Sequence, residues 1–195
     1  MIDLVKKLLI LCWVAGVVVA ANAAEVVWDF ESLQNVAPPS WAPKSPTGHV
    51  SEAEDIACEN GSLTFTSKKP HCYFWLNFAE TVEGTAFDAK QFHFLKIRFQ
   101  SPAPGKITLF YSSPDGEMAN MDSAIEVVEG WNEYEIDLQD MTFGREVHSP
   151  EGKNYERWGG DLQQVKGLRI DTWFPADTTV KFDYIKLSDE KVGQK

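Results

Sequence analysis

The chain has 195 residues, the size of one ordinary domain. Its 29 acidic residues outnumber its 18 basic residues, and the formal net charge is -11 at pH 7. An acidic domain repels phosphate backbones, so the composition excludes nucleic acid as a natural partner.

The first 23 residues differ in composition from the rest of the chain. Lys6 and Lys7 precede the apolar run LLILCWVAGVVVA, and Ala21-Asn22-Ala23 follows it. A basic start, an apolar stretch and small residues before a cleavage point are typical of a secretory signal peptide. The apolar run is shorter than the ~20 residues that a membrane-spanning helix needs, which favours cleavage over stable membrane insertion. We therefore expect a secreted or periplasmic protein with a signal peptide at 1–23, a single domain at 24–190 and a flexible tail at 191–195.

Cys12 belongs to the predicted signal peptide, which leaves Cys58 and Cys72 in the domain. Cysteines in a chain bound for an oxidising compartment usually pair. These two bracket the segment ENGSLTFTSKKPH, and closing that loop would contribute about 3 kcal/mol in the chain-entropy picture. The sequence favours a Cys58–Cys72 disulfide, with two free buried thiols as the alternative.

The domain consists of short strand-like segments separated by turn residues. No helical heptads interrupt them, and the Pro-rich stretch 37–46 cannot be a central strand because proline lacks a backbone donor. The pattern predicts an all-β fold, an antiparallel β-sandwich of roughly nine strands. The segment 140–165 breaks the rhythm and is expected to be a long loop with one helical turn. The strand-like segments are 25–30, 62–67, 72–78, 92–99, 106–112, 123–129, 131–138, 167–174 and 179–187.

Alternation within these strands separates a core face from an outer face. Leu168 and Ile170 point inward, so their neighbours in the strand point outward, and the same reasoning applies to 72–78 and 92–99. A sheet that faced only water would rarely carry so much aromatic surface. The outward aromatic, amide and charged residues on these three strands include Tyr73, Trp75, Asn77, Arg98, Arg169, Asp171 and Trp173.

An outer face of this kind suits a carbohydrate ligand. Sugars offer CH-rich ring faces that stack on indole and phenol rings, and hydroxyls that bond to charged and amide groups. The three aromatic residues of the set are candidate platforms, and the other four are candidate hydroxyl partners. Two structural explanations remain open: the rings are covered by the 140–165 loop or the Pro-rich stretch, or Arg169 and Asp171 form a structural ion pair with a neighbouring strand. Aromatic residues in the predicted loops either form a second binding site or close the ends of the sandwich: Trp41, Tyr155 and Trp158.

The segments WDFE, WNEYEIDL, WGG, GLRID and FDYIKL carry a family resemblance. From Val26 to Leu187 the chain resembles secreted jelly-roll modules of the galactose-binding-like superfamily, many of which are carbohydrate-binding modules. The resemblance implies glycan recognition on a sheet or at loop ends, and a structural calcium ion between the first and last strands. In this chain the calcium ligands would be Asp29, Glu31 and Asp183, since carboxylates are suitable ligands for calcium. Plain surface charge is the alternative for these acids.

No complete catalytic motif is present in the sequence. The segment 135–139 resembles the E-I-D-x-E strand of jelly-roll glycoside hydrolases, but Gln139 replaces the second glutamate and cannot transfer a proton. The segment 91–93 resembles the Q-x-H of jelly-roll alginate lyases, whose other motifs are missing. We therefore expect a non-catalytic domain that binds carbohydrate. The alternatives are a structural or interaction module of the cell envelope with an exported protein partner, and a jelly-roll lyase or hydrolase with an unrecognised site.

Overall fold

The computed structural model describes residues 25–31, 50–76, 87–112, 118–121, 124–145, 154–160, 163–165 and 167–190. Within these ranges the chain forms strands, two short 3-10 helices, η2 (Ala89–Gln91) and η3 (Leu138–Asp140), and no α-helix. All the paired strands are antiparallel, so the predicted all-β antiparallel sandwich is confirmed. No helix in the described ranges is long and apolar enough to cross a membrane. The predicted signal peptide at 1–23 and tail at 191–195 lie outside them.

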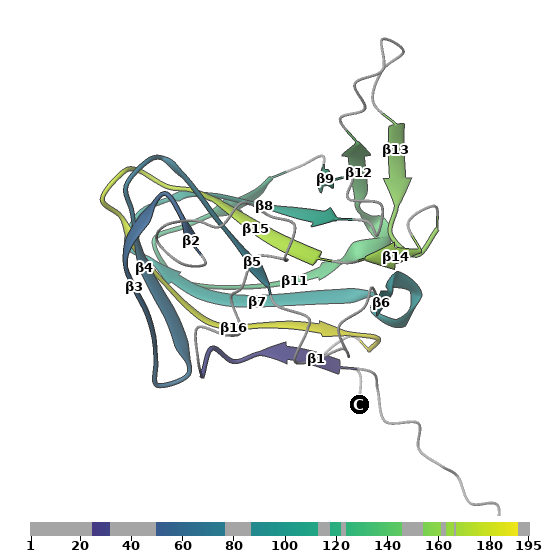
Figure 1. Ribbon diagram of the computed structural model, residues 1–195, viewed down its shortest axis with the longest axis horizontal. Coiled ribbons are helices and arrows are strands. Elements are labelled where there is room, and N and C mark those ends of the chain that lie inside the picture. Colours follow the sequence, from purple (N-terminus) through teal and green to yellow (C-terminus); the bar gives the residue numbers. More distant parts are fainter. Residues whose placement is uncertain are drawn as a thin grey trace, which may run out of the picture.

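Six strands form one layer, which we call the β16 sheet (Figure 1). β16 (Thr179–Ser188) is its central strand, and β1 (Glu25–Trp28) pairs with the second half of β16 although the two are far apart in the sequence. A register shift between Phe182 and Tyr184 marks an irregularity in β16. The order of the remaining strands is β11 (Gly130–Asp137), β7 (Phe94–Ser101), then β16, β4 (Ser62–Ser67) and β3 (Ala53–Glu59).

Eight strands form the second layer, the β15 sheet. β15 (Gly167–Trp173) is an inner strand between β8 (Gly105–Ser112) and β5 (His71–Leu76). At one end of the sandwich in Figure 1, the β12–β13 ladder projects beyond the other strands. The other strands are β13 (Asn154–Arg157), β12 (Thr142–Arg145), β9 (Met118–Met121), β2 (Val50–Ser51) and β10 (Ile125–Val127), and a separate ladder pairs β14 (Gln164–Val165) with β6 (Phe87–Asp88).

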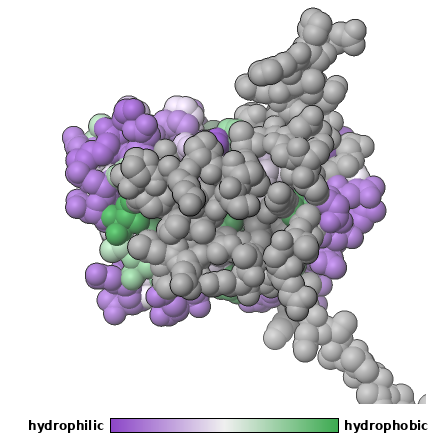
Figure 2. All heavy atoms as spheres, in the orientation of Figure 1, coloured by the Kyte–Doolittle hydropathy of each residue, from purple (hydrophilic) through white to green (hydrophobic). Residues whose placement is uncertain are grey.

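The core lies between the two sheets and is rich in phenylalanine. Phe74 of β5 meets Phe182 of β16 edge to face, and Phe99 of β7 stacks on Phe182, with 5.0 Å between the ring centroids in both pairs. All three rings are fully buried. Burial of one such side chain contributes about 1.5–3 kcal/mol, so this cluster holds the two layers together. Most of the coloured exterior in Figure 2 is hydrophilic, as expected when the apolar faces of both sheets point inward.

The segment 140–165 differs from the loop that the sequence predicts, because it contains β12, β13 and β14. β12 pairs with both β9 and β13, and such pairing between distant segments cannot be recognised from local alternation. Trp158 is buried, which agrees with the explanation that the loop aromatic residues close the ends of the sandwich. Its Nε1 donates a hydrogen bond to the Phe92 carbonyl at 2.6 Å. Gly159 follows with a φ of 69°, a left-handed turn conformation that favours glycine.

The predicted Cys58–Cys72 disulfide is wrong, because both cysteines are free thiols in the structure. Cys58 lies on β3 of the β16 sheet, whereas Cys72 lies on β5 of the β15 sheet. The Cys72 Sγ donates to the Glu52 carbonyl at 2.9 Å, and burial raises the pKa of this thiol. Burial also raises the pKa of Cys58 to about 11. The strand pairing places the two residues in different layers, although they are close in the sequence.

Candidate functional site

The outward side of β5, β15 and β8, which we call the β15 face, collects most of the residues predicted to form a site. Backbone register aligns these side chains in rows across the three strands. Because side chains alternate along a strand, three such rows point away from the core. The rows are Trp75–Arg169–Phe110, Tyr73–Asp171–Thr108 and His71–Trp173–Lys106.

An ion pair between Arg169 and Asp171 lies at the centre of the β15 face. The Arg169 Nε donates to Asp171 Oδ1 at 2.6 Å, and Nη2 donates to Oδ2 at 2.8 Å, which is a bidentate contact. The Asp171 side chain is 1% exposed and the Arg169 side chain 13% exposed. A charge this deeply buried needs a partner, and the fork of arginine matches both carboxylate oxygens.

Aromatic rings complete the surroundings of Arg169. Its Cζ lies 4.0 Å from the ring centroid of Phe110 and 4.5 Å from that of Tyr73. Trp75 is the third ring, at 5.6 Å. Cation–π attraction to these rings adds to the ion pair, so the guanidinium is held in place on several sides.

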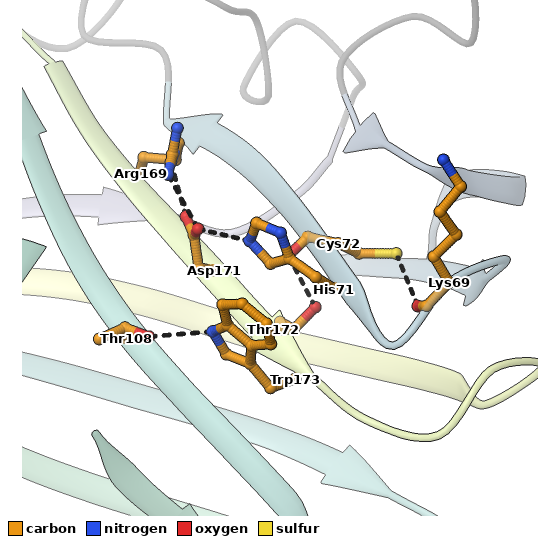
Figure 3. A network of polar contacts seen from close by, with 8 residues as sticks. All are labelled: Lys69, His71, Cys72, Thr108, Arg169, Asp171, Thr172 and Trp173. Atoms are coloured by element: carbon orange, nitrogen blue, oxygen red, sulfur yellow. Dashed lines mark hydrogen bonds and ion pairs between the residues drawn. The ribbon is translucent and has the colours of Figure 1, made fainter.

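His71 connects the buried ion pair to the exposed part of the face, as Figure 3 shows. Its Nε2 lies 2.7 Å from Asp171 Oδ2, and because an ionised carboxylate only accepts hydrogen bonds, Nε2 carries a proton. The His71 ring stacks on the Trp173 indole with 4.1 Å between centroids and 10° between planes. Asp171 therefore fixes the orientation of His71, and His71 supports the indole.

Trp173 is the exposed aromatic residue of the three rows. It is 46% exposed, whereas Trp75 is 3% exposed and Tyr73 and Phe110 are half-buried. The Trp173 Nε1 donates to Thr108 Oγ1 at 3.2 Å, so the indole is held by a hydrogen bond on β8 as well as by the stacked histidine on β5. An indole fixed in this way offers a flat apolar surface to solvent.

The structure brings together five of the seven residues predicted for a ligand site: Tyr73, Trp75, Arg169, Asp171 and Trp173. Trp75 is too deeply buried to serve as an open platform, which corrects that prediction. Arg169 and Asp171 do form a structural ion pair, but with each other along β15 rather than with a neighbouring strand as the alternative had it.

The two other predicted residues are not placed on the β15 face. Arg98 lies on β7 in the opposite sheet, where Nη1 donates to Asp183 Oδ2 at 2.6 Å and Cζ lies 4.7 Å from the Trp131 ring centroid. Asn77 and the loop residue Trp41 lie outside the described residues, and the side chain of Tyr155 is likewise not described.

Sequence reasoning missed His71, Thr108 and Phe110. The strand was predicted to begin at Cys72, so His71 was excluded, although it is two residues before Tyr73 and must share its face. Thr108 and Phe110 alternate with the buried Ile107 and Leu109, and that pattern alone would have placed them outward. Only their alignment with β15 shows that they belong to the site.

The carboxylates predicted to bind calcium are not gathered into a metal site. Among the described residues, which include Asp29, Glu31 and Asp183, no group of three potential ligands is close enough to hold an ion. Asp183 pairs with Arg98, and Asp29 Oδ1 accepts a 3.4 Å hydrogen bond from the Glu31 backbone N–H. Within the described part of the chain, these three carboxylates therefore do not form a cluster of ligands by themselves.

No known protein family matches this sequence, and no curated protein matches it either. Solved structures do match the fold. A family 30 carbohydrate-binding module is 14% identical with a TM-score of 0.51, covering 88% of this chain and 91% of the module. A mutant of a family 29 carbohydrate-binding module is 11% identical with a TM-score of 0.50, covering 89% of this chain and 99% of the module.

A longer enzyme also contains a similar sandwich. An agarase is 11% identical with a TM-score of 0.50 over 87% of this chain, which spans only 25% of the agarase. The match to PfGH50B likewise spans 22% of that protein. At these identities the likeness concerns the fold: this chain is an antiparallel β-sandwich of the type found in carbohydrate-binding modules.

Proposed function

We propose that this protein is a non-catalytic carbohydrate-binding domain that stacks a sugar ring on Trp173. The observation that carries the proposal is an indole that is 46% exposed yet held in place by His71 and Thr108. The similarity in fold to carbohydrate-binding modules supports it, as does the resemblance of the sequence to galactose-binding-like modules. The leader-like residues 1–23 support export, to the cell exterior or the periplasm.

The physical basis is a preorganised platform. The apolar face of a pyranose ring gains contact with the indole, and little side-chain entropy is lost because the indole is already fixed. Thr108, His71 and Lys106 lie in the two rows around Trp173 and supply polar groups at its border. In this proposal Arg169 and Asp171 act as positioning residues, because Asp171 contacts His71 and Arg169 holds Asp171 in place.

Binding to a panel of polysaccharides in affinity gels tests the proposal. We expect Trp173→Ala to weaken retention by about tenfold or more, which corresponds to roughly 1.4 kcal/mol or more. The matched control is Trp131→Ala, because Trp131 is 48% exposed but lies on β11 in the opposite sheet. We expect the control to bind within about twofold of the wild type.

Three outcomes would reject the proposal. They are retention of all binding by Trp173→Ala, equal losses in both variants, and no binding by the wild type to any polysaccharide. Thermal unfolding of both variants would show whether a lost signal reflects a lost fold.

A further inference from the structure

The cations of the β15 face are all paired with acids in the structure. Arg169 is bound to Asp171, as described above, and Lys106 Nζ lies 3.0 Å from Glu126 Oε1 on the neighbouring strand β10. Lys106 is the residue aligned with Trp173 on β8. The two cationic side chains within the three rows, apart from histidine, are thus each matched by one carboxylate.

The turn that leads into His71 shows the same pattern. Lys68 pairs with Glu54, and its Nζ is also 3.8 Å from Asp177 Oδ1. Lys69 Nζ lies 2.9 Å from Glu52 Oε2. The lysines and the arginine described around the exposed indole are therefore each in an ion pair with a carboxylate of the protein.

The aromatic rings around Arg169 further limit the access of a ligand to its guanidinium group. Its Nε and Nη2 are occupied by Asp171, and Phe110 and Tyr73 lie within 4.5 Å of its Cζ. A ligand carboxylate or sulfate would have to displace Asp171, which is itself 1% exposed. Displacing it would leave a buried charge without a partner, which is strongly unfavourable.

The charge of the whole chain adds to this local effect. A formal net charge of -11 repels a polyanion at low salt, and the described residues of the β15 face offer no excess of positive charge to offset that repulsion. Stacking on an indole does not depend on ligand charge, so the remaining attraction is the same for charged and uncharged sugars.

We infer that the Trp173 platform takes uncharged glycans and excludes those that carry carboxylates or sulfates. This inference rests on the proposed carbohydrate-binding function and names the ligand class of the same site. The chemistry that recognises the ligand is ring stacking with neutral hydroxyl hydrogen bonds, without an ion pair between protein and sugar.

Affinity gels containing neutral polymers (β-glucan, mannan, xylan, agarose) and anionic polymers (polygalacturonate, alginate, carrageenan) test the inference. We expect retention by one or more neutral gels only, with less than about a twofold change in affinity between roughly 20 and 500 mM NaCl, because no ion pair is screened. Glu126→Lys would release Lys106 and add a second cation near Trp173. This variant is expected to gain retention on anionic gels at low salt and to lose it again at high salt.

Two results overturn the inference and are distinguishable from each other. Trp173-dependent retention of the wild type by an anionic polymer, weakening as salt rises, leaves the proposed function intact and rejects the selectivity. Absence of retention by both classes of polymer rejects the proposed function and the selectivity with it.

Discussion

Replacing Asp171 by alanine is the sharpest test of how the β15 face is built. The substitution removes the two hydrogen bonds from Arg169, at 2.6 and 2.8 Å, and the contact with His71 at 2.7 Å. Arg169 would then be a cation with 13% exposure and no acidic partner in the described site. Breaking a buried pair from one side costs about 3–5 kcal/mol, and we expect the lower end because part of the guanidinium reaches solvent.

The assay is urea unfolding followed by circular dichroism, with the free energy of unfolding compared at constant m-value. Asp171→Leu combined with Arg169→Met serves as the matched control, since replacing both charges by apolar groups is often neutral or stabilising. Glu126→Gln serves as a second control, because the Lys106–Glu126 pair is exposed and is expected to contribute less than about 1 kcal/mol. A loss below about 1 kcal/mol for Asp171→Ala, or a loss in the double variant as large as in the single one, would refute the reasoning.

Other predictions concern pH, backbone packing and thiols. A hydrogen bond from Lys96 lowers the pKa of Glu133 below its ordinary value of 4.5. Above that pH the wild type should therefore be more stable than Glu133→Gln, and this advantage in the free energy of unfolding should disappear as the pH falls through the lowered pKa of Glu133. Equal pH profiles of the two proteins in urea unfolding would contradict this. Gly105→Ala should destabilise the fold by about 1–3 kcal/mol by the same assay, because a Cβ there would lie 2.2 Å from Phe174; an unchanged stability would contradict the packing. In a thiol-reagent assay, the unfolded full-length chain, which has three cysteines, should show three reactive thiols, and the Cys58→Ser variant should show two. A count of one reactive thiol in the wild type would instead support the disulfide.

Sequence alternation predicted the long strands because their buried residues recur at every second position. Each predicted segment overlaps a strand of the structure, and Leu168 and Ile170 are in the core as expected. β3 was missed because it lacks this pattern: it lies at an edge, its register shifts between Glu54 and Ala57, and Asp55 has a φ of 53°.

The candidate site was only partly predictable, because alternation shows which side of a strand a residue occupies but not which sheet the strand joins. Arg98 was grouped correctly as outward and wrongly with Trp173, since β7 and β15 belong to opposite layers. The Arg169–Asp171 pair is local, two residues apart on one strand, whereas the sequence reasoning considered an ion pair with a neighbouring strand. The support of Trp173 by His71 depends on the antiparallel register of β5 and β15, for which the sequence contains no local signal.

The residues that meet on the β15 face are far apart in the sequence, and this separation determines how late in folding the face can form. The hydrogen bond between His71 and Asp171 joins residues 100 positions apart, and β16, the last strand described, is at the centre of its sheet. Topologies dominated by such distant pairings fold slowly, in milliseconds to seconds, because loop closure precedes the gain from contacts. The exposed indole surface of Trp173, with its support by His71, should therefore be among the last features to form during folding. A bound glycan would then act as a reporter of the completed sandwich, raising its melting temperature while leaving partly folded chains unaffected.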